Sequence, residues 1–338
     1  MSIDPTILPG ARVAVRTCMN VQPDDRVIVI SDQPTEEIGR ALIQEAEAAG
    51  AATRLLLMED FGPRPMLQAP PELVQAIRDF APTVSFMAVQ GQPGEVAFRM
   101  ELGKALRELK VRHGHMPGIT KQLMREGMNV DYQRIHDITY KVYEIVRQAR
   151  TIRTTSPNGT DLTAAFSPEL RWRPCHGLYH HPGDWGNLPE GEVFTCPADV
   201  NGVIVADILG DYFSEKYGIL ETPLVITIEN GQVTDVTGEN QALVEEFIAY
   251  LDSDPNGRRV GEFAIGTNIA LTHLVGNLLQ DEKFPGLHVA FGNPYAHITG
   301  ADWVAKTHVD VIPTRCTIEV DGRRIMTDGV YASDILEG

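Results

Sequence analysis

Arg26-Val-Ile-Val-Ile-Ser31 begins the stretch that most clearly indicates the architecture of this chain. It is followed by Thr35-Glu-Glu and by a run that ends near Ala49. The first segment is short, apolar and β-branched, as expected of a buried strand. Thr35 and the two glutamates form a helix-capping signal, and Gly50 marks the end of that helix. The stretch therefore predicts a strand that passes directly into a helix.

The same alternation continues through the first half of the chain. We expect strands at 53–58 and 83–89, and a strand end near His113-Gly-His-Met-Pro-Gly118. Alternating strands and helices predict a mostly parallel sheet covered by helices. No GxGxxG or GxxxxGK[ST] motif occurs, so the layout does not by itself indicate a nucleotide. The helices between the strands are expected at 71–80, 98–109, 120–128 and 131–149.

Near residue 150 the pattern changes to hairpins. Pro-Asn-Gly, Asn-Gly and Asp-Gly turns separate alternating apolar segments. Helices are fewer there, and we expect them at 241–252 and 267–279. A chain of 338 residues is too long for one ordinary core. We therefore predict an α/β N-terminal domain with a mostly parallel sheet at residues 1–150, and a β-rich α+β metal-binding domain at 151–338.

The composition excludes several classes of partner. With a net charge of -17, the chain is a poor ligand for nucleic acid or for an anionic membrane surface. No apolar run reaches the length of a membrane span, and the N-terminus lacks the pattern of a signal peptide. The four cysteines show no CxxC spacing, which favours reduced thiols and a cytoplasmic protein.

Four segments of the second half are rich in metal-ligand side chains: 187–195, 261–266, 288–295 and 308–310. Mixed carboxylate, imidazole and phenol groups suit divalent metals such as zinc, cobalt, manganese or iron(II). In the first segment either Glu190 or Glu192 can be the ligand, and we favour Glu192. The candidate ligands are Glu192, Glu262, His288, Tyr295, His308 and Asp310.

The strength of each signal differs. Residues i and i+2 of an extended segment share a face, so His308 and Asp310 can reach one ion, although such a pair is more often only hydrogen-bonded. Glu262 stands among apolar neighbours, where a carboxylate is costly to bury unless it is paired or metal-bound. His288 and Tyr295 each have an ordinary interpretation, as a satisfied core histidine and a packed aromatic residue.

Other residues are candidates for contact with substrate rather than metal. Gly177 and Pro182 make a zinc-binding helix across the cluster Cys175-His176 and His180-His181 improbable. His113 and His115 follow a predicted strand, near the sheet edge where α/β sites tend to open. We predict that the substrate contacts include His113, His115, His180 and Trp185.

In their order along the chain, the ligand segments resemble the thermophilic-type metallo-aminopeptidase family, which includes aminopeptidases T and S. The matching motifs are Asn187–Phe194, Gly261-Glu262, His288 with Tyr295, and His308-Val-Asp310. The resemblance implies a dimeric exopeptidase with two divalent ions (Zn, Co or Mn) held by the six candidate ligands. It also implies that Glu192, Glu262 and Tyr295 act in catalysis, with a carboxylate as general base.

The segments 185–197 and 308–321 also resemble a relative of these peptidases, 2,5-dihydroxypyridine 5,6-dioxygenase. That resemblance implies one iron(II) and a triad such as His288, His308 and Asp310. Glu262, His288 and Tyr295 favour the hydrolytic arrangement. We therefore predict a cytoplasmic homodimer that removes N-terminal residues from small peptides or cleaves a related small amide, with ring cleavage of a hydroxylated pyridine as the alternative. A metal-binding protein without catalytic activity is the third possibility.

Overall fold

The computed structural model describes residues 2–92, 94–210 and 212–337. The chain forms two compact units, and each unit is built from two stretches of sequence. The first comprises Met1–Arg134 and Gly177–Glu190, and the second comprises Ile135–His176 and Gly191–Gly338. One unit holds a parallel sheet with helices and the other holds an antiparallel sheet, which confirms the predicted α/β and β-rich folds. The predicted domain boundary at residue 150 stays a prediction.

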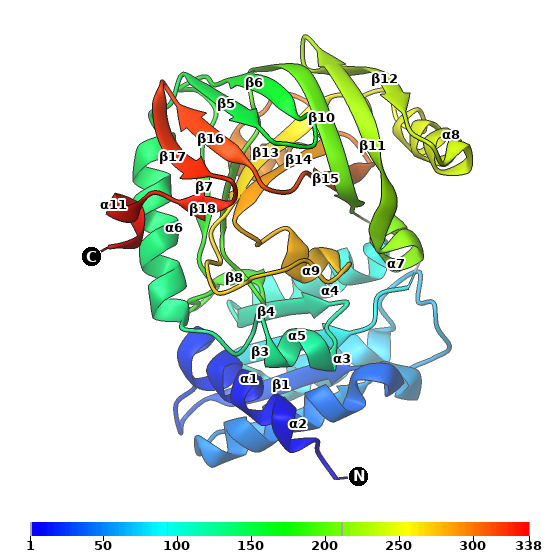
Figure 1. Ribbon diagram of the computed structural model, residues 1–338. Coiled ribbons are helices and arrows are strands. Elements are labelled where there is room, and N and C mark those ends of the chain that lie inside the picture. Colours follow the sequence, from blue (N-terminus) through cyan, green and yellow to red (C-terminus); the bar gives the residue numbers. More distant parts are fainter. Residues whose placement is uncertain (1, 93, 211, 338) are drawn as a thin grey trace. The chain divides into compact units, whose positions relative to one another are not determined.

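The first unit contains a five-stranded parallel sheet with the strand order β2-β1-β3-β4-β8 (Figure 1). Its edge strand β8 comes from a stretch that the sequence analysis assigned to the second domain. β8 pairs with β4 in parallel, from His113 opposite Trp185 to His115 opposite Asn187. The strands are β1 (Arg26–Ser31), β2 (Ala52–Leu57), β3 (Val84–Val89), β4 (Arg112–Pro117) and β8 (Trp185–Asn187).

Helices of the first unit pack on this sheet through regularly spaced apolar side chains. In α2, Ile38, Leu42 and Ala46 recur every four residues and are buried. They lie on one face of the helix, which packs against β1 and β2. Short 3-10 turns cover 5–7, 33–35 and 58–60, and a π-helical turn covers 13–18. The α-helices are α1 (Leu8–Arg12), α2 (Glu36–Ala48), α3 (Pro71–Phe80), α4 (Val96–Glu108) and α5 (Lys121–Arg125).

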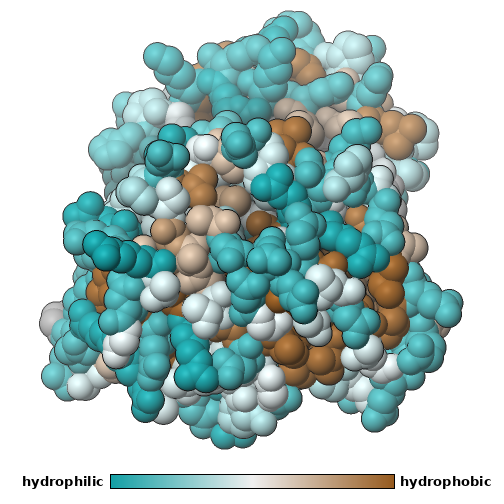
Figure 2. Space-filling view, turned by 90° about the horizontal axis from the view of Figure 1, so that it is seen from above, coloured by the Kyte–Doolittle hydropathy of each residue, from teal (hydrophilic) through white to brown (hydrophobic). Residues whose placement is uncertain are grey.

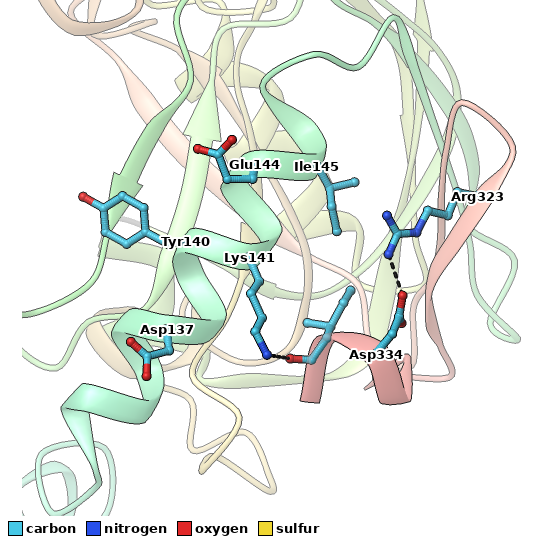
Figure 3. A pocket seen from close by; sticks show the side chains of 8 residues that line it. Asp137, Tyr140, Lys141, Glu144, Ile145, Arg323 and Asp334 are labelled. Carbon is cyan, nitrogen blue, oxygen red and sulfur yellow. Dashed lines mark hydrogen bonds and ion pairs between the residues drawn. The ribbon is translucent and has the colours of Figure 1, made fainter. Parts of the chain in front are cut away.

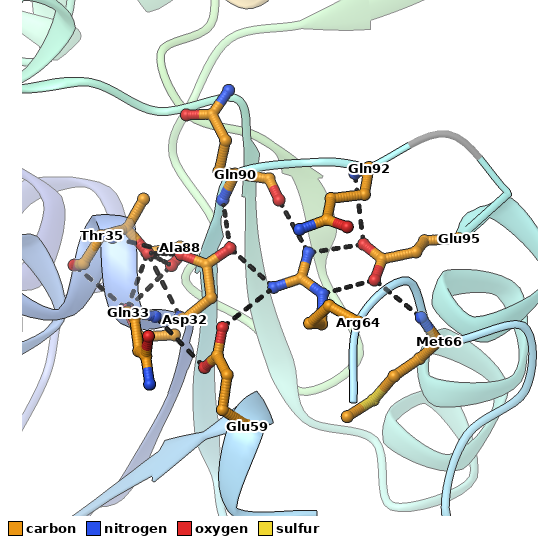
Figure 4. Close-up of polar contacts among 11 residues, drawn as sticks. Asp32, Gln33, Thr35, Glu59, Arg64, Met66, Ala88, Gln90, Gln92 and Glu95 are labelled. Carbon is orange, nitrogen blue, oxygen red and sulfur yellow. Dashed lines mark hydrogen bonds and ion pairs between the residues drawn. The ribbon is translucent and has the colours of Figure 1, made fainter. Parts of the chain in front are cut away.

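A buried ion network fills the carboxyl end of the parallel sheet (Figure 4). Asp32 directly follows β1, and Gln90 directly follows β3. The Arg64 guanidinium donates to Asp32 Oδ2 at 2.8 Å, to the Gln90 carbonyl at 2.8 Å and to both oxygens of Glu95. The side chains of Arg64, Asp32 and Glu95 are at most 5% exposed.

This network occupies the place where open α/β sheets usually bind ligands. In the strand order β2-β1-β3, the chain reverses direction across the sheet between β1 and β3. Ligands of open α/β sheets usually bind in the crevice at this reversal point. Here the chain's own Arg64 and its two carboxylate partners occupy that position, so they hold the sheet end closed.

Replacing Arg64 with Gln is expected to lower the free energy of unfolding by about 3–5 kcal/mol, because it leaves Asp32 and Glu95 buried without their cation. The matched control is Arg78→Gln, since Arg78 pairs with Glu108 while both side chains are 52% exposed. The control should change stability by less than about 1 kcal/mol. Urea denaturation measures both values, and equal effects of the two substitutions would contradict the structural role of Arg64.

The second unit is built on one large antiparallel sheet that curls around its own core (Figure 1). Its main strand path is β18-β17-β16-β5-β6-β10-β15-β14-β13-β9-β7, and β11 and β12 extend it from β10. The strands are β5 (Thr151–Thr155), β6 (Asp161–Ala165), β7 (Arg173–Cys175), β9 (Glu192–Thr195), β10 (Asp199–Leu209), β11 (Ile219–Glu229), β12 (Gln232–Thr237), β13 (Val260–Gly266), β14 (Gly286–Gly292), β15 (His308–Ile312), β16 (Thr317–Val320), β17 (Arg323–Thr327) and β18 (Val330–Tyr331).

Apolar side chains of α6 join the core of this sheet. Ile138, Val142 and Val146 are spaced by four residues and are fully buried in that core. Most of α6 belongs to the second unit. The α-helices are α6 (Tyr132–Val146), α7 (Tyr212–Tyr217), α8 (Gln241–Leu251), α9 (Leu278–Asp281), α10 (Ala296–Thr299) and α11 (Ser333–Leu336).

The helix predicted at 267–279 is wrong. The structure has a loop there, followed by the short helix α9. The Asp281 carboxylate accepts hydrogen bonds from the backbone N–H groups of Val275, Gly276 and Asn277 at 2.7–3.0 Å. These bonds satisfy the loop backbone in a non-helical conformation, and local apolar periodicity does not predict them.

Within the described residues, no helix is both long and apolar enough to span a membrane. The face shown in Figure 2 is mostly hydrophilic, and its hydrophobic side chains gather in separate patches. The large hydrophobic residues that are exposed come from many parts of the sequence: Leu67, Met100, Leu109, Tyr140, Trp185, Ile219, Val304 and Val330.

Candidate metal centre

Four neighbouring strands of the second unit, β9, β13, β14 and β15, carry most of the predicted ligands. In an antiparallel ladder, directly paired residues project to the same face of the sheet. Glu262 of β13 pairs with Ala290 of β14, and Ala290 pairs with Asp310 of β15. Glu192 of β9 pairs with Gly266, which shares the face of Glu262 because it lies four residues further along. Three carboxylates from three strands thus share one face.

The two histidines project to the same face. His288 pairs with Ala264, two residues from Glu262, and His308 pairs with Gly292. Within β13, β14 and β15 the direct partners of these candidates are alanine and glycine, whereas Glu192 also pairs with Cys175 of β7. Small side chains at these positions leave space above the sheet that the longer carboxylates and imidazoles share.

The Glu262 motif begins with glycine because the backbone at residue 261 passes close to β14. The ladder shifts register between Val260 and Glu262, which is the mark of a β-bulge. A Cβ atom on Gly261 would lie 2.2 Å from the Gly292 carbonyl oxygen. The bulge aims Glu262, and its backbone passes close to β14 only because residue 261 has no side chain.

The polar atoms on this face lie within a few ångströms of each other. His288 Nε2 is 3.2 Å from Glu192 Oε2 and 3.6 Å from Glu262 Oε1. His308 Nε2 is 3.8 Å from Glu262 Oε2 and 3.6 Å from Asp310 Oδ2. The His308 side chain is 22% exposed, whereas those of the other four are at most 8% exposed. His308 therefore marks the side of the centre that faces solvent.

Tyr295 completes the set of predicted ligands. Its backbone has φ = 48°, a left-handed conformation that is unusual for a bulky residue, and its ring lies 4.8 Å from the His308 ring. Burial and the nearby carboxylates, Glu262 first among them, raise the pKa of the Tyr295 phenol well above its ordinary value. A strained residue held against the cluster supports a functional role for Tyr295.

The structure adds two residues that the sequence analysis missed, Glu282 and Lys283. Lys283 is fully buried, and its Nζ lies 2.9 Å from Glu192 Oε1 and 2.7 Å from Glu282 Oε1. Glu282 in turn groups with His288 and Asp310. In the sequence, Asp281-Glu282-Lys283 has the appearance of a solvated turn, because adjacent Glu and Lys residues are rarely buried.

Burial and mutual charge shift the pKa values of the cluster in opposite directions. Burial raises the pKa of Glu262. Glu192 is also buried, but the Lys283 ammonium and the His288 imidazole outweigh burial and lower its pKa to about 2. The carboxylates Glu192 and Glu262 overcome the effect of burial on His288 and raise its pKa to about 10. A site that holds a proton this strongly has a high negative potential, which favours a cation.

The residues fit a divalent metal ion. Two overlapping groups have ligand atoms within 4.8 Å of one another: Glu192, Glu262 and His288, and Glu282, His288 and Asp310. Ligand atoms that surround one ion at about 2.0–2.2 Å are themselves about 3–3.5 Å apart, close to the observed spacings. Among the described residues, Glu192 Oε2 and His288 Nε2 are buried and lie 3.2 Å apart without forming a well-aligned hydrogen bond. Buried polar atoms of this kind call for a partner.

Glu190 and Glu192 lie in different units. Glu192 lies in β9 of the second unit, with its carboxylate directed at His288. Glu190 belongs to the first unit, where its carboxylate accepts hydrogen bonds from Tyr179 Oη at 3.2 Å and from the Asn187 N–H at 3.1 Å. The preference for Glu192 therefore agrees with the geometry.

Three of the four predicted substrate contacts form a cluster in the first unit. His113 Nδ1 lies 2.8 Å from Ser85 Oγ, and His113 Nε2 lies 3.4 Å from His115 Nδ1. The Trp185 ring lies 5.4 Å from that of His115 and stacks at 6.4 Å on that of His113. His113 and His115 occupy the second and fourth positions of β4, so they do not lie at its carboxyl end as expected. Exposed His180 instead contacts the Thr17 carbonyl at 2.8 Å.

Acid should destabilise the first unit through His113. Burial, and then the charge of Arg107, lower the pKa of His113 to about 3. Below about pH 6.5 the histidine is protonated in the unfolded chain but stays neutral in the folded protein. The free energy of unfolding therefore falls as the pH drops. Between pH 7 and 5, His113→Gln should lose about 2 kcal/mol less unfolding free energy than the wild type. Chemical denaturation at both pH values measures this difference, and equal losses would contradict the buried neutral state of His113.

A groove of about 490 Å³ lies beside α6 and α11 in the second unit (Figure 3). Its polar groups tie the C-terminal helix to its neighbours: Lys141 Nζ donates to the Ile335 carbonyl at 3.1 Å, and Arg323 pairs with Asp334 at 2.6 Å. None of the predicted site residues lines it. The groove is therefore lined by residues other than those of the candidate metal centre.

The fold and the converging face define a two-unit α/β and β-rich protein with a candidate metal centre on its antiparallel sheet. The profile of the family described as 2,5-dihydroxypyridine 5,6-dioxygenase (NicX) matches residues 128–333. The chain belongs to this family.

Solved structures with the same fold include both relatives that the sequence resembles. One is 2,5-dihydroxypyridine dioxygenase from Pseudomonas putida KT2440, with a TM-score of 0.71, 16% identity, and coverage of 96% of this chain and 97% of that one. Another is AmpT from Thermus thermophilus, with a TM-score of 0.69, 20% identity, and coverage of 97% and 99%. No curated protein matches the sequence significantly. At these identities the likeness concerns the fold.

Proposed function

We propose that this protein is a metal-dependent hydrolase that releases N-terminal residues from small peptides or cleaves a related small amide. The observation that carries the proposal is the position of Glu262, whose two oxygens lie 3.6 Å from His288 Nε2 and 3.8 Å from His308 Nε2. A third carboxylate between the two imidazoles exceeds the two-histidine, one-carboxylate set of non-haem iron oxygenases. It suits the oxygen-rich centres of hydrolytic metals.

Glu192, Glu262, His288, His308 and Asp310 would hold the metal. A bound divalent ion lowers the pKa of a water molecule and polarises the scissile carbonyl. Glu262 is the better general base, because burial raises its pKa, whereas Glu192 is committed to Lys283. Tyr295 remains protonated, since its pKa is raised, and its hydroxyl can therefore donate to a developing oxyanion.

The variant Glu262→Gln keeps the shape of this side chain but removes its charge. It should weaken the binding of Zn(II) or Co(II) at least about 100-fold and abolish hydrolysis, because even partners outside the ligand shell contribute factors of 10–100. Glu239→Gln is the matched control, since Glu239 is exposed. Metal titration and activity on a panel of dipeptides and amino-acid amides provide the readouts. Unchanged metal affinity in E262Q would contradict the assignment.

Membership of the dioxygenase family supports a second candidate, iron(II)-dependent cleavage of a hydroxylated pyridine ring. Its ligands would be His288, His308 and Asp310. The described structure does not group these three within 4.8 Å, and His308 belongs to neither of the two groups found there, although His308 and Asp310 are 3.6 Å apart. The carboxylate count thus favours hydrolysis, and the family profile favours ring cleavage.

Two measurements on the purified protein separate these candidates. We expect elemental analysis to find zinc, cobalt or manganese, and we expect dipeptide hydrolysis without oxygen uptake. Iron as the activating metal, with oxygen consumption on addition of 2,5-dihydroxypyridine, would instead establish the second candidate. The protein must also be reconstituted with iron(II) under anaerobic conditions before the activity assay, so that oxidation of the iron is not mistaken for an inactive enzyme.

The biological setting belongs to the same proposal. We infer a cytoplasmic homodimer that acts on a small molecule or a short peptide. The four cysteines are free thiols, which supports a reducing compartment. We also propose that the cluster of His113, His115 and Trp185 in the first unit contacts the substrate.

A further inference from the structure

We propose that the Lys283 side chain supplies a cation that takes the place of a second metal ion, so that each chain binds one divalent ion. The inference rests on the metal centre of the proposed function, but it does not depend on which reaction that centre catalyses.

Glu192 is shared between two cationic positions. Its Oε1 lies 2.9 Å from Lys283 Nζ, while its Oε2 lies 3.2 Å from His288 Nε2. One carboxylate thus joins two cationic positions, as a bridging carboxylate joins two ions in a two-metal site. On one side of the bridge stands the ammonium, and on the other lie the histidine and Glu262.

The two candidate ligand groups overlap in His288 and are linked by Lys283. Lys283 contacts one carboxylate of each group, Glu192 of the first and Glu282 of the second. Both groups also need His288. The Nε2 atom that faces Glu192 and Glu262 has a single lone pair and so binds a single ion. Two ions therefore cannot fill both groups through this one atom.

The charge of this face also favours a single divalent ion. The face gathers four carboxylates, Glu192, Glu262, Glu282 and Asp310, and the ammonium of Lys283 compensates one of them. One divalent ion reduces the remaining negative charge to a single unit when the histidines are neutral and all four carboxyl groups are ionised. A second divalent ion would make this buried face positive and would lie near the fully buried ammonium, which is unfavourable in a medium of low dielectric constant.

Metal stoichiometry tests the inference directly. The full-length protein is stripped with a chelator, titrated with Zn(II) or Co(II) by calorimetry, desalted, and analysed for metal content. The wild type should bind one ion per chain. Lys283→Gln removes the charge and should gain a second site, with an affinity at least tenfold higher than any second binding event in the wild type. Lys283→Arg keeps the charge and should remain at one ion.

Lys216→Gln is the matched control, because Lys216 also pairs with a glutamate but is 52% exposed. It should bind one ion, like the wild type. Circular dichroism establishes that each variant is folded. Two tightly bound ions in the wild type would overturn the inference, and this result does not require any variant to fold. A folded K283Q protein that binds only one ion would overturn it as well.

The two proposals fail separately. If the wild type binds one ion but hydrolyses no peptide or amide, the reaction is wrong and the role of Lys283 stands. If it binds two ions and hydrolyses peptides, the role of Lys283 is wrong and the hydrolase stands.

Discussion

The candidate centre depends on the register of four antiparallel strands. A shift of one residue in β13 or β14 would turn Glu262 or His288 to the opposite face, because side chains alternate along a strand. The bulge at Gly261 and the close contact of its backbone with Gly292 fix this register. The alanine and glycine residues that lie opposite the ligands within β13, β14 and β15 then leave the space in which the long side chains meet. Geometry set by the backbone thus determines the chemistry of this face.

Electrostatics explains how several carboxylates can be buried together on this face. Buried carboxylates repel one another and lose hydration, so they persist only where a cation compensates them. Here the compensation is divided between an ammonium that belongs to the chain and the strongly basic His288, whose pKa of about 10 reflects the surrounding negative charge. A metal ion that replaces this proton would relieve the same repulsion. In the first unit, Arg64 compensates a buried carboxylate at the end of the parallel sheet.

Much of this architecture follows from local patterns. β1, α2, the hairpins of the second unit and α8 lie close to their predicted ranges, because their apolar periodicity is also the pattern that packs. The helix expected at 267–279 fails because Asp281 holds that loop through backbone hydrogen bonds. β8 joins the parallel sheet across a long sequence separation, and no local pattern indicates this pairing.

The same distinction applies to the centre. Glu192, Glu262, His288, His308 and Asp310 were recognisable as isolated ligand types, and the structure brings them together. Glu282 and Lys283 were not recognisable, since their burial is decided by the tertiary fold around α9 and β14. A charged pair that a sequence assigns to solvent becomes part of the centre only through three-dimensional packing.

The most direct test of the account is a diffraction experiment at the absorption edge of zinc or cobalt on metal-loaded crystals. The account predicts an anomalous peak at bonding distance, about 2.0–2.2 Å, from His288 Nε2 and from a Glu262 oxygen. A fully loaded crystal with no anomalous peak on this face of the sheet, or with its metal bound elsewhere, would contradict it.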